Sequence, residues 1–261
     1  MLFAALLMGA FALLGAATGR AQDTTPLVAT TGPNVLGQGR IQWNSQFEYM
    51  HWAWKSMLGS KSGHNLGTAT GLRFGIGNRA ELTLDLAGSY STTNNLFGFT
   101  PAAGAKLLLF DGRGWLPQTA FFTHISAPSS QDAYSREWRP PYVQPEIGLQ
   151  FRNRVGGRFL IDYSLGYMWN LYSSSNSIDP VNQLQYSLAG RWLATDCLML
   201  GLGISNRNIF HETAADMELR YQASPSLQLS LSASVQAGAS DYGLDATDEI
   251  HALAGISWML K

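Results

Sequence analysis

The stretch Arg79–Tyr90, with the sequence RAELTLDLAGSY, decides the fold class of this chain of 261 residues. Apolar side chains alternate along it with mostly polar ones, with Ala80, Leu82, Leu84 and Leu86 on one face of an extended chain and Glu81, Thr83, Asp85 and Ala87 on the other. A period of two is typical of a strand with one apolar and one polar side. A second such strand, over 66–76, precedes it across the dipeptide Gly77-Asn78, and the module recurs to the end of the chain.

This recurring pattern predicts a closed membrane barrel rather than a soluble domain. A soluble protein of this length should show helical periodicity or strands that are apolar on both faces, and beyond its N-terminal segment this sequence shows neither. In a closed barrel the apolar face contacts lipid and the polar face lines the lumen.

Composition supports the barrel and excludes two other classes of protein. Charged residues make up 13% of the chain, whereas about 25% is usual for a soluble domain. Small polar residues, 27 glycines and 11% aromatic residues take their place, as expected where half of each strand is polar. A helical membrane protein needs apolar runs of about 18 residues or more, and none follows residue 19. The net charge of −1 gives no basic patch for nucleic acid.

Residues 1–21 are predicted to be a cleaved secretory signal peptide. The chain is continuously apolar from Met1 to Ala17, and Gly19 and Ala21 then match the small-x-small pattern of a cleavage site. The alternative is a retained anchor helix, but the apolar core is short for a membrane span. Cys197 is the only cysteine in the sequence, which excludes an internal disulfide.

The mature chain is expected to begin with a loose periplasmic lead-in over 22–38, followed by an outer-membrane barrel over 39–261. Twelve strands are predicted, at 39–53, 66–76, 79–90, 98–110, 116–126, 142–152, 158–171, 182–193, 198–205, 214–222, 227–237 and 250–261. Short turns near 77, 111, 155, 195 and 224 alternate with longer polar loops at 54–65, 91–96, 127–141, 172–181, 206–212 and 238–249.

This alternation of connections predicts the orientation of the barrel. An even strand number, with short turns at one end and long loops at the other, is expected of bacterial outer-membrane barrels, in which short turns face the periplasm and long loops the exterior. A soluble two-sheet sandwich is the alternative, but its strands would average about 5–6 residues, and these are longer. Aromatic residues gather near strand ends on the apolar face, as membrane-interface belts do: Trp43, Tyr49, Tyr90, Phe151, Phe159, Trp169, Tyr186, Trp192, Tyr221 and Trp258.

Two segments, GPNVLGQGRIQWNSQFEY and GLRFGIGNRAELTLDL, resemble the outer-membrane transporter family of the "meta-pathway of phenol degradation" type. That family has a proline-containing lead-in with a Gly-rich turn, and then a Gly-x-Gly-Asn/Asp-Arg-x-Glu-Leu hairpin. The segments FTPAAGAKLLLF and FFTHISAP fall where it has its next strands and a loop entry. This chain departs at Thr31-Gly32-Pro33, where an acidic Asp-Arg-Pro element is usual, and at Met259-Leu260-Lys261, where many such barrels have a terminal aromatic residue. The resemblance implies passage of small, often hydrophobic or aromatic compounds.

A lumen lined by mixed charges is the predicted functional site. Barrels of about eight strands are filled by side chains, whereas barrels of about sixteen hold an aqueous channel, so twelve strands predict a narrow or partly plugged pore. Five acids and five bases are predicted to face the lumen: Arg73, Glu81, Asp85, Lys106, Glu146, Arg152, Asp162, Arg191, Glu218 and Arg220. Most lie toward the short-turn ends of their strands. They can form a constriction that selects solutes, or a structural network that stiffens the barrel, and the sequence leaves both open.

Lipid hydrolysis is an alternative function, because His124 and Ser126 have a spacing that places both side chains on one face of a strand. Outer-membrane phospholipases and lipid A deacylases carry such a pair. In them Asn-Gly usually follows the serine, whereas Ala127-Pro128 follows here, and Glu146 is the only acid on the next predicted strand. The two side chains are also expected to face the lumen, away from lipid. We therefore do not expect an enzyme.

An adhesin or structural barrel is the third possibility. It would act through its loops, and the candidate recognition surface is the loop 127–141, with Tyr134, Arg136, Trp138 and Arg139. No phosphate-binding loop, metal cluster or nucleotide fingerprint is present in the sequence, so no cofactor is expected. The predicted partners are outer-membrane lipid, small-molecule solutes and, during assembly, the barrel-insertion machinery. A passive channel, monomeric by default, is the function that the sequence favours.

Overall fold

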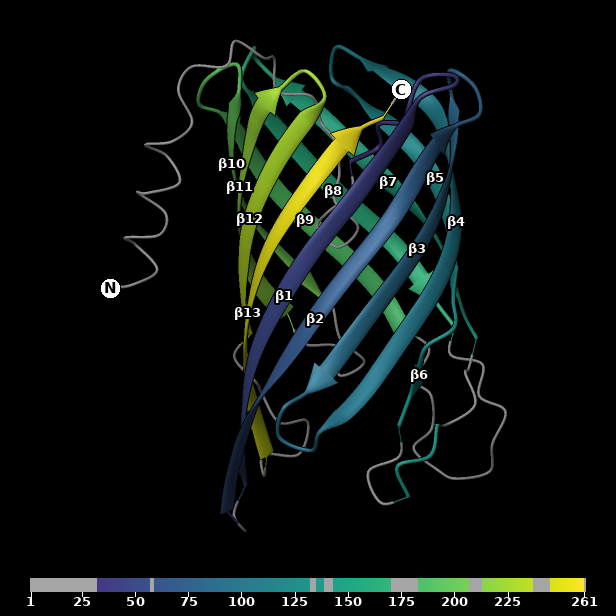
Figure 1. Ribbon diagram of the computed structural model, residues 1–261. Helices are drawn as coiled ribbons and strands as arrows, with labels where there is room; N and C mark the ends of the chain where they lie inside the picture. The colour runs from purple at the N-terminus through teal and green to yellow at the C-terminus, as the bar shows by residue number, and fades with distance from the viewer. Residues whose placement is uncertain are drawn as a thin grey trace.

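The computed structural model describes residues 32–56, 59–131, 135–138, 143–169, 183–206, 213–236 and 245–260. Within these residues the chain forms one closed antiparallel barrel of tilted strands (Figure 1). Twelve of the described strands close the barrel, and a thirteenth, the short β6, adds to one rim. The predicted fold, an all-β, twelve-stranded, up-and-down barrel, is confirmed.

Consecutive strands pair with one another around the barrel, apart from β6. The strands are β1 (Ile41–Ser56), β2 (Gly59–Gly75), β3 (Ala80–Ser91), β4 (Leu96–Arg113), β5 (Leu116–Ser126), β6 (Ser129–Ser130), β7 (Gln144–Val155), β8 (Phe159–Met168), β9 (Gln183–Leu193), β10 (Leu198–Asn206), β11 (Thr213–Ser224), β12 (Leu227–Gln236) and β13 (Asp245–Met259). β5 pairs directly with β7, and β1 pairs with both β2 and β13, which closes the ring. Closure leaves no open sheet edge, and a sheet in lipid requires this because its main chain has no water to bond.

The alternation in sequence sets which side chains face outward. On β3, Leu82, Leu84 and Leu86 expose 43%, 54% and 51% of their surface. Glu81, which precedes Leu82 on the same strand, exposes only 1%. The outer face is therefore apolar and meets lipid, and the inner face is polar. The short turns and the C-terminal end lie at one rim, the upper one in Figure 1, which we call the short-turn end; the opposite rim is the long-loop end.

Aromatic side chains form pairs on the outer face near both rims. At the short-turn end Trp43 lies opposite Trp258, and the rings of Phe159 and Trp192 stack with centroids 6.4 Å apart. Toward the long-loop end the ring of Tyr90 lies 4.8 Å from that of Phe97. This arrangement fits two interfacial belts, since aromatic rings favour the headgroup level of a bilayer.

Two predicted long loops overlap with strands in the structure. The loop expected at 54–65 is wrong, because β1 and β2 stay paired as far as Ser56 and Gly59. The loop expected at 238–249 is also wrong at its end, since β13 already begins at Asp245. Beyond the bilayer a hairpin needs no apolar outer face, so these polar strand ends carry no alternation by which they could be recognised.

The turn predicted at Asp111-Gly112 is wrong as well. Both residues belong to β4, and the chain turns instead at Gly114 and Trp115. Gly112 adopts a left-handed φ of 74° close to a register shift between Leu108 and Phe110. Glycine is favoured at such an irregularity as it is in a turn, which is why the dipeptide misled the prediction.

The described part of the loop 127–141 extends the barrel wall. β6 pairs with Gly98 and Phe99 of β4, and the guanidinium of Arg136 donates a hydrogen bond to the carbonyl oxygen of Asn95 at 2.6 Å. The ring of Trp138 lies 5.3 Å from that of Phe99. The described part of this candidate recognition surface therefore packs against the start of β4.

Several predictions fall on parts of the chain that the structure does not describe. They are the signal peptide at 1–21, the lead-in up to residue 31, the loop at 172–181 and most of the loop at 206–212. In the described ranges no helix is long and apolar enough to cross a membrane.

We expect Leu84→Arg to lower the free energy of unfolding in lipid vesicles by about 2–4 kcal/mol, because it places a charge on the lipid-facing side of a strand near the bilayer centre. Denaturant titration followed by tryptophan fluorescence measures this change. Leu84→Ala is the control for the lost side chain. Equal effects of the two substitutions would show that Leu84 does not face lipid.

Candidate functional site

All ten predicted lumen residues lie on the inner face of the barrel, and they fall into three groups. Three of them form an ionic triad on β2, β3 and β4. Five form an arginine network on β7, β8, β9 and β11. The last two, Asp85 and Glu146, flank a histidine farther toward the long-loop end. The first two groups are nearly inaccessible: Glu81, Arg191 and Arg220 each expose 1% of their surface.

The ionic triad consists of Arg73, Glu81 and Lys106. Adjacent strands place Glu81 directly opposite Lys106 on one side and Gly75 on the other. Arg73 holds the carboxylate in a fork, with its Nη2 2.8 Å and 2.7 Å from the two oxygens, while Nζ of Lys106 lies 3.5 Å from Oε1. Nη1 of Arg73 also donates to Oε1 of Gln42 at 3.0 Å. A charge buried in this way requires such partners, because burial removes its hydration.

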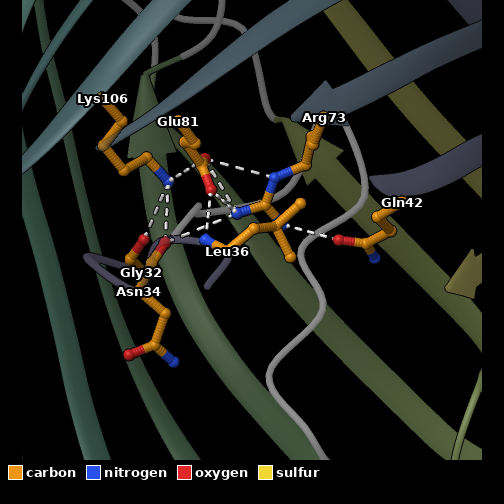
Figure 2. Close-up of polar contacts among 7 residues, drawn as sticks. All are labelled: Gly32, Asn34, Leu36, Gln42, Arg73, Glu81 and Lys106. Carbon is orange, nitrogen blue, oxygen red and sulfur yellow. Dashed lines mark hydrogen bonds and ion pairs between the residues drawn. The ribbon is translucent and has the colours of Figure 1, made fainter. Parts of the chain in front are cut away.

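The lead-in enters the lumen and binds to the triad through its main chain (Figure 2). The amide of Leu36 donates to Oε2 of Glu81 at 2.8 Å. Lys106 donates to the carbonyl oxygens of Gly32 at 3.2 Å and Asn34 at 3.5 Å, and Arg73 donates to that of Asn34 at 3.4 Å. The sequence predicted a loose periplasmic lead-in over 22–38, and the structure places residues 32–37 of it against the lumen wall. We call these six residues the plug segment.

Glycine at position 75 makes room for the plug segment. A Cβ atom at Gly75 would overlap with the carbonyl oxygen of Gly37 and lie 2.8 Å from that of Leu36. The main chain of Gly75 also anchors the base of the segment, since its carbonyl accepts from Gly39 at 2.9 Å and its amide donates to Arg40 at 2.9 Å. Gly39 turns the chain back toward β1 with a left-handed φ of 72°.

The arginine network occupies the other side of the lumen. Arg152 binds Asp162 in a two-pronged contact, with both N···O distances 2.6 Å. Arg191 lies between two acids: it contacts Asp162, and its Nε donates to Glu218 at 3.2 Å. Nε of Arg220 donates to the other oxygen of Glu218 at 2.6 Å. Three arginines thus share two carboxylates in a chain that links four strands.

The remaining predicted residues lie around His124. Its Nε2 is 3.8 Å from a carboxylate oxygen of Asp85, and its Nδ1 is 4.0 Å from one of Glu146. Ser126 donates its hydroxyl to Oε1 of Gln144 at 3.3 Å. In the described residues no hydrogen bond joins His124 to Ser126, so the pair does not have the contact between nucleophile and base that hydrolysis requires.

Sequence reasoning missed a further charged group toward the long-loop end. His251 of β13 bonds to Glu48 of β1, with Nδ1 2.8 Å from Oε1, and to Glu249, with Nε2 3.2 Å from Oε2. The alternation of β1 already placed Glu48 on the polar face. Its partner lies 203 positions away, which no local pattern reveals. Within the described ranges, no group of three or more His, Cys, Asp or Glu residues is arranged to hold a metal ion.

A comparison with family models identifies the family of this chain. The family model described as "Putative MetA-pathway of phenol degradation" matches residues 27–246. The chain belongs to this family. The match begins before the plug segment and ends after the start of β13, so it takes in both ionic groups of the short-turn end. A search of the curated proteins found no match.

Several solved structures share the barrel fold of this chain. An outer membrane channel from Pseudomonas putida F1 superposes with a TM-score of 0.62 at 11% identity, covering 91% of this chain and 100% of that one. The toluene transporter TodX from Pseudomonas putida gives a TM-score of 0.52 at 8% identity, covering 92% and 95%. The transport unit of the autotransporter AIDA-I from Escherichia coli gives 0.51 at 12% identity, covering 83% and 89%. At these identities the likeness is one of fold.

We expect Asp162→Asn to lower the free energy of unfolding by about 3–5 kcal/mol, because it leaves two buried guanidinium groups without their shared carboxylate. Asp111→Asn is the control, since it breaks an ion pair with Arg79 in which both side chains are more than half exposed. That exposed pair should contribute less than about 1 kcal/mol. Denaturant titration in vesicles compares the two variants, and equal losses would contradict the buried network.

Proposed function

We propose that this protein is an outer-membrane channel through which small solutes pass passively. The observation that carries the proposal is the barrel itself, an apolar outer wall around a lumen lined by polar and charged side chains. Membership of the family and the barrel fold shared with an outer membrane channel support it. The family description also supports small aromatic or hydrophobic compounds as the solutes.

The narrowest part of the path is proposed to lie at the short-turn end. There the ionic triad and the plug segment fill the side of the lumen formed by β2, β3 and β4, while the arginine network fills the side formed by β7 to β11. A lumen of twelve strands is intermediate in width between barrels filled by side chains and barrels that hold a water-filled channel. A charged constriction in such a lumen restricts passage to small molecules.

The constriction carries a net positive charge. The triad has two bases and one acid, and the arginine network has three bases and two acids, so the two groups together carry a charge of +2. Farther toward the long-loop end the carboxylates outnumber the basic side chains that they contact: Asp85 and Glu146 flank His124, and Glu48 and Glu249 flank His251. A solute therefore crosses two regions of opposite field, which filter charged molecules by sign.

The proposed channel function also implies where the protein lies in the cell. An outer-membrane barrel requires export, which the predicted signal peptide at 1–21 would provide, and insertion by the barrel-assembly machinery. We place the short-turn end in the periplasm and the long loops outside, as in other outer-membrane barrels. A closed barrel buries its own lumen, so one chain suffices for a pore.

The test is planar-bilayer conductance of the refolded mature chain, Gln22–Lys261. We expect small stepwise currents from the folded barrel, and the same currents from Ser126→Ala, because no reaction at Ser126 is needed for passage. Silence from the folded chain, with and without Ser126→Ala, would contradict the channel. Loss of current in Ser126→Ala alone would favour a role for the His124–Ser126 pair.

A further inference from the structure

We propose that His51 and His64 form a binding site for a divalent transition-metal ion, of the Zn²⁺ or Cu²⁺ kind, on the outer wall of the barrel. The two histidines lie on neighbouring strands, β1 and β2. The inference is independent of the channel function proposed above, because these side chains belong to the outer face and not to the lumen.

The histidine pair stands at the edge of the apolar wall toward the long-loop end. His51 lies directly opposite His64, and the next outward-facing pair toward the bilayer is Tyr49 with Leu66. Tyr49 and Leu66 expose 38% and 36% of their surfaces, as lipid-facing side chains do. His64 is exposed and His51 is half-buried. The pair therefore lies one step beyond the apolar face, where an ion can reach it from water.

The two imidazoles present the same nitrogen to each other. Nδ1 of His51 lies 3.3 Å from Nδ1 of His64, and the ring centroids are 4.8 Å apart. Two Zn–N bonds of about 2.0–2.1 Å that meet at a tetrahedral angle place their nitrogens about 3.3–3.4 Å apart. One ion bound by both nitrogens would therefore require little movement of either ring.

A metal ion can use both nitrogens at once. Between neutral imidazoles an Nδ1–Nδ1 contact is a hydrogen bond only if one of the two nitrogens carries a proton, whereas an ion accepts a lone pair from each. Imidazole is a preferred ligand of Zn²⁺, Cu²⁺ and Ni²⁺, while Mg²⁺ and Ca²⁺ favour oxygen ligands. The hydroxyl of Tyr49 lies 2.6 Å from Nδ1 of His64, and an ion would replace that hydrogen bond.

The main chain fixes the spacing of the two ligands. At His51 the strand β1 is paired on both sides, with β2 and with Ile250 of β13. The carbonyl oxygen of His64 accepts hydrogen bonds from the amide of Thr92 at 3.0 Å and from its hydroxyl at 2.8 Å. Ligands placed on paired strands keep their geometry better than ligands on loops.

Two protein ligands leave the other coordination positions to water. The described residues provide no group of three or more His, Cys, Asp or Glu around an ion. A zinc site with open positions holds water there, as catalytic zinc sites do. The pair should therefore bind its ion reversibly and less tightly than a closed structural site.

Titration calorimetry with Zn²⁺ tests the site on the refolded mature chain, Gln22–Lys261, prepared without a histidine tag. We expect one ion per chain, and His51→Gln and His64→Gln should each weaken binding more than about tenfold, because loss of even an outer-shell partner costs about 10–100-fold in affinity. His124→Gln is the matched control, since it removes a histidine that lies between two carboxylates in the lumen. Folding of each variant is checked by its heat-dependent mobility in detergent gels.

Electron paramagnetic resonance with Cu²⁺ then identifies the ligands. The spectrum should show coupling to two nitrogens in the unsubstituted chain and in His124→Gln, and to fewer in His51→Gln or His64→Gln. Zn²⁺ affinity that is equal in the unsubstituted chain and in both outer-wall variants, or no binding by the folded unsubstituted chain, would overturn the site. Loss of binding in His124→Gln alone would also overturn it, and would place the ion in the lumen.

Discussion

This structure depends on one constraint, namely that every main-chain amide and carbonyl within the bilayer must form a hydrogen bond inside the protein. A strand in a bilayer has no water to bond its amides and carbonyls, so every strand needs a neighbour on both sides. Pairing of β1 with β13 meets that need by closing the sheet. A twelve-stranded barrel also encloses a lumen that is too wide for the wall side chains alone to fill and too narrow to hold bulk water. The ionic groups and the plug segment occupy that lumen.

Charge inside the lumen is arranged so that each group is held by several others. Glu81 receives Arg73, Lys106 and the amide of Leu36, and Asp162 receives two arginines. Buried ion pairs of this kind cost free energy to form, but breaking one costs more, because removal of one member leaves its partner as an unpaired charge that water does not solvate. In the function proposed above, the same networks both stiffen the barrel and constrict the path. The two interpretations of these charges that the sequence left open describe one set of contacts.

Much of the fold could be predicted because it follows from local alternation. The period of two in Arg79–Tyr90 placed Glu81 and Asp85 inside and the leucines outside, and turn residues such as Gly77-Asn78 marked real turns. The prediction failed where alternation no longer reports the environment, as in the paired ends of β1 and β2 beyond the bilayer. At Gly112 it failed because glycine serves an irregularity in a strand as readily as a turn.

The candidate site was predictable in its membership but not in its connections. Each lumen residue lies on a polar strand face, yet which acid meets which base depends on register and on partners far apart in sequence. The plug segment was not predictable at all from its own residues, since Gly32, Asn34 and Leu36 bind through main-chain groups that every residue possesses. The absence of a side chain at Gly75 is the one local sign that another segment of the same chain passes close to it.

Amide hydrogen exchange at Leu36 tests the central claim most directly, because that amide donates to a carboxylate buried in the lumen. The mature chain would be folded in detergent or lipid, and exchange at Leu36 followed by NMR, with Glu81→Gln beside it. The account predicts strong protection of the Leu36 amide and faster exchange when the carboxylate is neutralised. Exchange at the rate of an unstructured peptide in the folded barrel would contradict it, and would place the lead-in outside the lumen.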